Sequence, residues 1–235
     1  MRATLGPEVG VVTVDGLAAS GKSSVAQRVA NALAVPFVSS GLLYRAATHL
    51  VTGTGVDPLD EEAVLECLLT HEVGLEPGVR ANRVRIDGAD VTTALHTAEV
   101  DASVSRVAAH PRVRQWVSQR LREVPVPFVV DGRDMGSAVF PSARHKFYLS
   151  ASPEERARRR AGERSADPSA VADAIARRDE LDARQSLPAP DAFFIDTDAL
   201  SLEQVVGTVL DTLRERGVEA RVRPRSFEVE GGRVG

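Results

Sequence analysis

Short apolar segments alternate with longer amphipathic segments along most of the 235-residue chain. The apolar segments are rich in valine and phenylalanine and carry almost no charge, which is typical of strands buried on both faces. We expect strands near residues 9–14, 36–38, 126–130, 147–149 and 192–196. Because helical segments separate these strands, the pattern predicts an α/β fold with a doubly wound parallel sheet. Ligands bind such sheets beyond the carboxyl ends of the strands.

The helices are predicted from their ends as well as from their apolar stripes. Asp60 precedes an acidic first turn, and Pro153 stands where a helix accepts proline. Ser201 and Gln204 have the spacing of a capping box, which marks the start of the last helix. We expect helices over about 40–51, 60–69, 97–123 with a break at Pro111, from Ser152 onward, and from Ser201 to Gly217.

Residues 72–91 have a different pattern from the rest of the chain. Val73 and Leu75 alternate with polar residues, as do Val84 and Ile86, and turn residues separate the two runs. Alternation of this kind predicts a small antiparallel sheet. We interpret this segment as an insert on the main fold.

Composition and charge exclude several classes of protein. A net charge of −4 with mixed signs argues against a dedicated nucleic-acid binder. The single cysteine, Cys67, excludes an internal disulfide framework and a cysteine-rich zinc site. No segment approaches the roughly 20 apolar residues of a membrane helix, and we expect no signal peptide at the N-terminus. We expect a soluble, cytoplasmic, monomeric protein with no nucleic-acid or membrane partner.

The segment GLAASGKS, from Gly16 to Ser23, follows the first expected strand and matches the phosphate-binding loop GxxxxGK[ST]. In such a loop backbone N–H groups face the phosphates, the lysine reaches the β and γ groups, and the hydroxyl holds Mg²⁺. Lys22 is one of only two lysines among 29 basic residues, so a compact charge persists there against an arginine bias. We predict a nucleoside triphosphate site, with Ser23 as the magnesium ligand, formed by Gly16, Leu17, Ala18, Ala19, Ser20, Gly21, Lys22, Ser23 and Ser24.

A phosphate-binding loop alone does not distinguish a kinase from a guanine-nucleotide switch or a motor ATPase. Switches read guanine with an Asn-Lys-x-Asp element, and the second lysine, Lys146, stands in a different context. Motor ATPases end a strand in Asp-Glu, whereas Asp131 is followed by Gly132. The remaining interpretation is phosphoryl transfer to an acceptor other than water. A regulatory nucleotide-binding module with little turnover is the alternative from another class.

Such a transfer requires a second anion site that faces the phosphate loop. Arginines supply candidates at positions 112, 114, 133, 156, 158, 159, 160, 177, 178 and 184. Arg133 follows a buried strand and a glycine, which places it at the ligand edge. For Arg158 and Arg177 a solvated helix face is the favoured interpretation. On a helix, Arg156, Arg159 and Arg160 share one face and Arg158 points elsewhere.

Seven segments of the chain together resemble the bacterial cytidylate kinases, in order from about Val11 to Arg216. They are VDGLAASGKSS, SSGLLYR, AAHPRVRQWV, VVDGRDMGSAVFP, SPEERARRR, RRDELDAR and DAFFIDT. The β insert also resembles the enlarged monophosphate-binding domain of that bacterial group. The resemblance implies transfer of the γ-phosphoryl group of Mg·ATP to CMP or dCMP. Another P-loop small-molecule kinase, acting on a monophosphate such as UMP or AMP, is the close alternative.

The resemblance implies one P-loop kinase domain over 1–235. It includes a monophosphate-binding region at 40–110 with the insert at about 72–91, a lid at about 156–170, and a tail at 218–235 that we expect to be flexible.

The resemblance also implies roles for single residues. Ser40, Tyr44 and Arg45 would line the monophosphate pocket, Ser105, Arg114 and Asp134 would read cytosine, and Arg178, Asp182 and Arg184 would approach the sugar or phosphate. Arg133 would hold the acceptor phosphate, and Lys22, Arg133, Arg156, Arg159 and Arg160 would be catalytic. A carboxylate suits the cytosine amine, whereas uracil reverses the donor pattern and leaves buried polar groups unmatched.

Two departures from the family pattern concern these sites. Ala19 stands where the family commonly has glycine, so it is strained if the loop needs a positive φ there. Arg184 lies one residue before the expected arginine position, which Gln185 occupies, and we assign Arg184 to the pocket.

Overall fold

A five-stranded sheet forms the centre of the computed structural model, which describes residues 10–78, 81–164, 172–173, 175–177, 179–180 and 187–218. Its strands are β1 (Val11–Gly16), β2 (Phe37–Ser39), β6 (Phe128–Gly132), β7 (His145–Ser150) and β8 (Phe193–Asp196). Their order is β2-β6-β1-β7-β8, and every neighbouring pair is parallel. The predicted doubly wound parallel sheet is confirmed.

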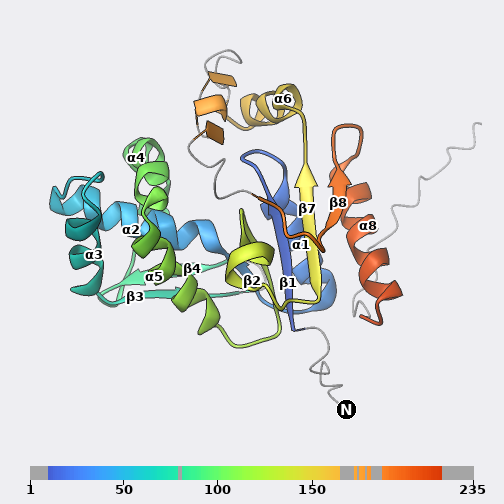
Figure 1. The fold of residues 1–235 in the computed structure, drawn as a ribbon, viewed down its shortest axis with the longest axis horizontal. Coiled ribbons are helices and arrows are strands. Elements are labelled where there is room, and N and C mark those ends of the chain that lie inside the picture. The colour runs from blue at the N-terminus through green and yellow to red at the C-terminus, as the bar shows by residue number, and fades with distance from the viewer. Residues whose placement is uncertain are drawn as a thin grey trace, which may run out of the picture.

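Helices cover both faces of this sheet (Figure 1). On one face α1 (Lys22–Leu33) and α8 (Leu202–Glu215) bury the strand residues Val12, Val14 and Val129. The opposite face packs against α2, α5 and η2 through Phe128 and Val130. The elements on that side are α2 (Ser40–Thr54), α3 (Glu61–Leu69), the 3₁₀ helix η1 (Thr92–His96), α4 (Ala98–Ala109), α5 (Pro111–Arg122) and the π-helical turn η2 (Met135–Val139). In Figure 1, α6 (Pro153–Arg164) lies beyond the arrowhead of β7.

The insert forms a separate three-stranded antiparallel sheet, as its alternating pattern predicts. Its strands are β3 (Val73–Glu76), β4 (Arg83–Ile86) and β5 (Ala89–Asp90), in the order β3-β4-β5. Val84 and Ile86 of β4 are buried and join the core that α2 and α5 share. The insert is therefore packed onto the main fold.

Helix ends follow the predicted signals. The Asp60 carboxylate accepts a hydrogen bond from the backbone N–H of Ala63 at 3.1 Å. Ser201 and Gln204 form the complete capping box before α8. The helical segment over 97–123 divides at His110, where Pro111 begins α5.

The strands begin or end one or two residues from the expected positions, and two of them differ for an identifiable physical reason. The strand expected over 126–130 begins at Phe128, because Pro127 has no N–H to donate to the neighbouring strand. It continues through Asp131 to Gly132, because the hydrogen bonds between strands are made by the backbone and do not depend on side-chain polarity. The strand expected as buried near 192–196 lies at the sheet edge, where Phe194 is 56% exposed. None of the described helices is long and apolar enough to cross a membrane.

Candidate active site

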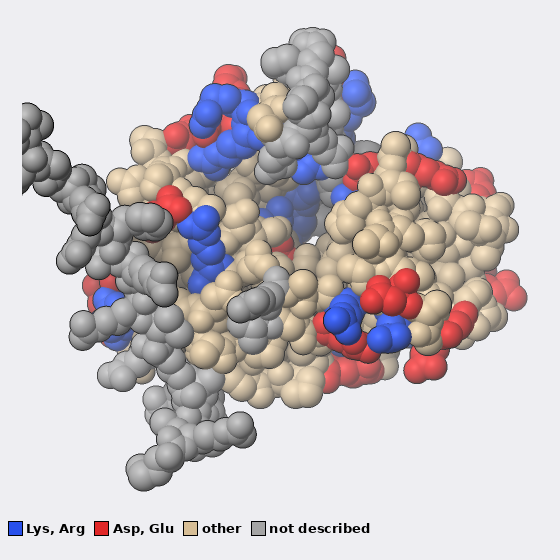
Figure 2. Space-filling model, turned by 180° about the vertical axis from the view of Figure 1, so that it is seen from behind, with Lys and Arg blue, Asp and Glu red and all other residues tan. Residues whose placement is uncertain are grey.

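The carboxyl ends of β1, β6 and β7 meet at one edge of the sheet, with β1 between the other two. Three connections leave this edge: the loop from Gly16 to Gly21, the turn at 133–134, and the segment that leads into α6. Figure 2 shows a hollow between the body that carries α2–α5 and the rest of the molecule, and basic side chains line it. Such a crevice at the carboxyl ends of parallel strands is where this architecture places ligands.

The loop from Gly16 to Gly21 has a backbone that few residues other than glycine adopt. Gly21, which precedes α1, has a φ of 86°. A Cβ atom on Gly16 would lie 2.5 Å from the carbonyl oxygen of Leu149, so the loop packs directly on β7. Ala19 has a φ of 60°, so this position does require a positive φ, and alanine carries strain that glycine would avoid.

Lys22, Ser23 and Asp131 form a polar group at the start of α1. Lys22 Nζ donates to the carbonyl oxygen of Leu17 at 3.1 Å, and the Ser23 hydroxyl donates to Asp131 Oδ2. Asp131 is 3% exposed. Burial raises the pKa of its carboxyl, and the nearby Lys22 ammonium acts against that rise. An ammonium, a hydroxyl and a carboxylate are thereby held together beside the loop.

Two buried oxygen atoms beside the loop bear on the fit of a bound ion. Within the described part of the chain, Ser20 Oγ and Asp131 Oδ1 are buried without a hydrogen-bond partner. Buried polar atoms are normally paired. Hydroxyl and carboxylate oxygens are ligands that Mg²⁺ accepts, so the residues present fit the predicted ion. Of the other predicted loop residues, Leu17 and Ala18 are partly buried and Ser24 is exposed.

The predicted base-reading pair joins α5 to the turn after β6. Arg114 on α5 and Asp134 after β6 form an ion pair, with 19% and 10% of their side chains exposed. The guanidinium of Arg114 lies 5.8 Å from the centre of the Tyr44 ring. Burial raises the pKa of the Asp134 carboxyl, and Arg114 opposes that rise. The structure therefore brings these three residues together.

Arg133 connects the turn after β6 to the phosphate loop, because its Nη1 donates to the carbonyl oxygen of Gly16 at 3.3 Å. Ser40, the first residue of α2, is buried at 3% exposure. Arg45 lies at the junction of α2 with α4, where it donates to Asp101 Oδ1 at 2.6 Å and to the carbonyl oxygen of Leu95 at 2.9 Å. Ser105 stands one helical turn after Asp101 on α4 and is partly buried.

The arginines of the predicted lid separate as the helical phase predicts. Arg156 is 3% exposed, pairs with Asp179 at 2.6 Å, and donates to the carbonyl oxygen of Ala18 at 3.4 Å. Arg159 donates to the carbonyl oxygen of Ser20 at 3.3 Å and to that of Thr197 at 2.6 Å. Arg160 is partly buried.

Arg158 differs from these three, since its side chain is 74% exposed and pairs with Glu155. Arg156 and Arg159 therefore reach the phosphate loop, and Arg158 faces solvent.

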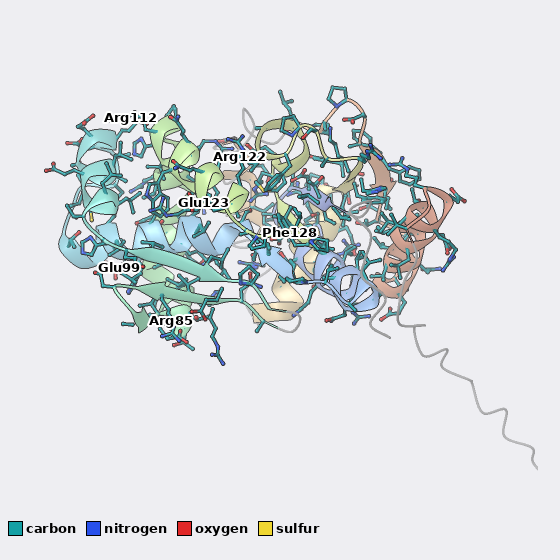
Figure 3. The ribbon with its side chains drawn as sticks, turned by 90° about the horizontal axis from the view of Figure 1, so that it is seen from below. Arg85, Glu99, Arg112, Arg122, Glu123 and Phe128 are labelled. Carbon is teal, nitrogen blue, oxygen red and sulfur yellow. The ribbon has the colours of Figure 1, made fainter. Side chains whose placement is uncertain are left out.

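Arg112 is not part of this group, although its sequence position suggested an anion site. It pairs with Glu62 of α3, and its backbone N–H donates to Glu61 at 2.7 Å. At the other end of α5, Arg122 donates to the carbonyl oxygen of Val139 at 3.0 Å. Figure 3 labels both arginines, at opposite ends of α5. These two arginines anchor the helix that carries Arg114.

The predicted residues Arg178, Asp182 and Arg184, the lid positions 165–170 and the tail beyond Val218 lie outside the described residues. Arg177 is exposed, as its alternative interpretation predicts.

Sequence reasoning missed three residues at this site. Asp15 is a lone acid in an apolar strand, and its carboxylate accepts from the backbone N–H groups of Met135 and Gly136. Asp131 was visible as an acid ending an apolar strand, but nothing in the sequence paired it with Ser23. Asn82 of the insert bonds to both sides of Val38: it accepts from the N–H of Ser39 and donates to the carbonyl oxygen of Phe37, each at 3.0 Å. No sequence pattern predicts the contact between Asn82 and Phe37, which are 45 residues apart.

Comparison with known proteins identifies the family. The family model for cytidylate kinase matches residues 12–215. The chain belongs to the cytidylate kinase family. A cytidylate kinase of Thermus thermophilus is 58% identical over 205 residues, which cover 87% of this chain and 99% of the relative. One of Deinococcus radiodurans is 54% identical over 200 residues, covering 85% of this chain and 97% of the relative.

Among solved structures, an uncharacterised protein from Eubacterium ventriosum superimposes with a TM-score of 0.50. It is 10% identical, and the match covers 88% of this chain and 99% of that one. At this identity the likeness concerns the fold alone. The family membership therefore rests on the sequence matches, which span nearly all of the described core.

Proposed function

We propose that this chain transfers the γ-phosphoryl group of ATP to CMP or dCMP, forming ADP and CDP or dCDP. The observation that carries the proposal is the Arg114–Asp134 ion pair, whose side chains are only 19% and 10% exposed. A carboxylate accepts from the cytosine amine, and a guanidinium donates to the ring N3 and O2 atoms. Family membership and the match over residues 12–215 support the same substrate class.

Chemistry of this kind depends on positioning and charge neutralisation. An oxygen of the acceptor phosphate attacks the γ-phosphorus, and the bond from that phosphorus to the β–γ bridging oxygen breaks. The acceptor oxygen is already anionic, so no strong general base is needed. In this proposal Arg133 holds the acceptor phosphate beside the loop, a role that its hydrogen bond to Gly16 supports.

The donor side uses the phosphate loop and the lid. Lys22 neutralises the β and γ phosphates, and Ser23 with Asp131 would hold Mg²⁺ near them. When bound, the ion supplies charge neutralisation on the phosphate oxygens. Arg156, Arg159 and Arg160 lie on the helix that covers the loop, and they would stabilise the transferring group and exclude water.

A coupled assay of ADP formation across CMP, dCMP, UMP and AMP tests this proposal. We expect ADP formation that depends on added CMP or dCMP, with a kcat/KM for UMP lower by at least about 10-fold, because unmatched buried polar groups disfavour the wrong base. Preference for AMP would overturn the cytosine assignment. ADP formation that no monophosphate stimulates would instead indicate a module without transfer.

A further inference from the structure

Asp15 is a buried carboxylate that the proposed mechanism does not use. It is 4% exposed and lies on β1 immediately before the phosphate loop. Burial raises the pKa of its carboxyl to about 7, even though two backbone N–H groups act against the rise. Burying an acid costs free energy unless hydrogen bonds compensate it, so the contacts of Asp15 are of interest.

The contacts of Asp15 lie at the start of η2. Its Oδ1 accepts from the N–H of Met135 and its Oδ2 from the N–H of Gly136, each at 2.8 Å. These are free amides of a first helical turn, which a residue at the N-cap position usually binds. Here the N-cap residue is Asp134, a preferred capping type, and its side chain makes no capping hydrogen bond.

The surroundings hold this arrangement closely. A Cβ atom on Gly132 would lie 2.5 Å from Met135 Cγ, so the turn folds back tightly on the end of β6. A Cβ atom on Gly136 would lie 2.9 Å from Thr13 Oγ1 and 3.3 Å from Asp15 Oδ2. The turn therefore sits on β1 at a distance that only glycine permits.

We propose that Asp15 is a positioning residue for the acceptor base: it caps η2 in place of Asp134 and so keeps the Asp134 carboxylate directed at Arg114. If the amides of Met135 and Gly136 lost this acceptor, the Asp134 carboxylate would compete to cap them and would leave Arg114. Asp15 thus acts through Asp134, and it also ties the acceptor side to the strand that starts the phosphate loop. This inference rests on the proposed function.

Asp15→Asn tests the inference when assayed above pH 7, where the carboxylate is mostly ionised, because asparagine keeps the shape but accepts from only one of the two amides. We expect the KM for CMP to rise by about 10-fold or more and the KM for ATP to change less than about threefold, with a smaller preference for CMP over UMP. Asp211→Asn is the matched control. Asp211 pairs with Arg214 on α8 with 66% of its side chain exposed, and its loss should leave both KM values unchanged.

A double-mutant cycle provides the deciding measurement. In an Asp134→Ala background, Asp15→Asn should change kcat/KM for CMP by less than about twofold, because its route of action is already gone. Additive effects, or an equal rise in both KM values, would overturn the inference. Should Asp15→Asn not fold, Gly136→Ala disturbs the same contacts with the charge retained and should give the same acceptor-selective loss. The acceptor panel on the unmodified chain separates failure of this inference from failure of the proposed function.

Discussion

The phosphate side and the acceptor side of the site are built in different ways. The phosphate side centres on one continuous stretch, Gly16 to Ser23, whose backbone geometry and short contacts such as Lys22 to Leu17 arise within a few residues. The acceptor side gathers side chains from α2, α4, α5 and the turn after β6, and ion pairs such as Arg114–Asp134 hold them. We therefore expect the loss of one group in the phosphate loop to abolish phosphoryl transfer. The loss of one group on the acceptor side should instead reduce the selectivity for the base. The following predictions test this difference.

The largest effect is expected at Lys22. Lys22→Met should reduce kcat by more than about 10³-fold with folding intact, because it removes the charge that neutralises the β and γ phosphates. Lys22→Arg should fail as well, since a planar fork does not replace a point charge in this loop. Single-turnover phosphoryl transfer and circular dichroism together measure both points.

Lys146→Met is the matched control, because Lys146 Nζ also donates to a carbonyl oxygen five residues back, that of Pro141 at 2.6 Å. Its ammonium bonds to Pro141 and Asp191, neither of which is a predicted site residue, so its loss should lower the Tm and leave kcat within about threefold. An arginine variant at position 22 with near-normal turnover would show that the compact charge is not required there.

The lid arginines should give the next largest effect. Arg156→Met should lower kcat by about 10³-fold with a much smaller change in the KM for ATP, the scale of an arginine that acts in the transition state. Arg158→Met makes the same chemical change on the solvent side of α6 and should be nearly silent, since 74% of its side chain is exposed. Steady-state kinetics on both variants decide this, and equal damage would mean that the lid works in another conformation.

On the acceptor side the effect should be smaller and selective. Arg114→Ala and Asp134→Ala should each weaken use of CMP by about 1–3 kcal/mol, because each leaves a buried partner unmatched. The KM for ATP should stay within about threefold. Specificity constants for CMP and UMP measure the loss, and equal losses for both bases would place the pair outside base recognition.

The smallest effect concerns the pH dependence of stability. The pKa of Asp15 is raised from 3.8 to about 7 in the folded chain, so between these values the folded state binds more protons than the unfolded state. The free energy of unfolding should therefore fall as the pH rises towards 7, by about 2 kcal/mol between pH 5 and pH 7. Asp15→Asn should lack this component. Thermal melts of both proteins from pH 5 to pH 8 test this through their difference, which cancels the titrating groups that do not interact with Asp15.

The same contrast explains what could be predicted from the sequence. The strand pattern, the helix caps and the phosphate loop depend on neighbours in the chain, and each was readable from spacing. The Arg114–Asp134 pair joins positions on separate elements, and only the resemblance to a family suggested it. The Ser23–Asp131 contact spans 108 residues and the Asp15 contacts about 120, so no local pattern records them. Arg112 shows the converse error, because composition alone does not tell an anion site from an interhelical ion pair.

Asn82 joins the insert to the edge of the central sheet through hydrogen bonds to the backbone of β2. β2 is an edge strand, and the side-chain amide of Asn82 occupies the N–H of Ser39 and the carbonyl oxygen of Phe37, while Gly78 accepts from the N–H of Phe37. Open strand edges of this kind recruit other chains and promote aggregation. The insert thus covers the edge of β2. A variant with the insert deleted would expose this edge to pairing with other chains, beside the acceptor site.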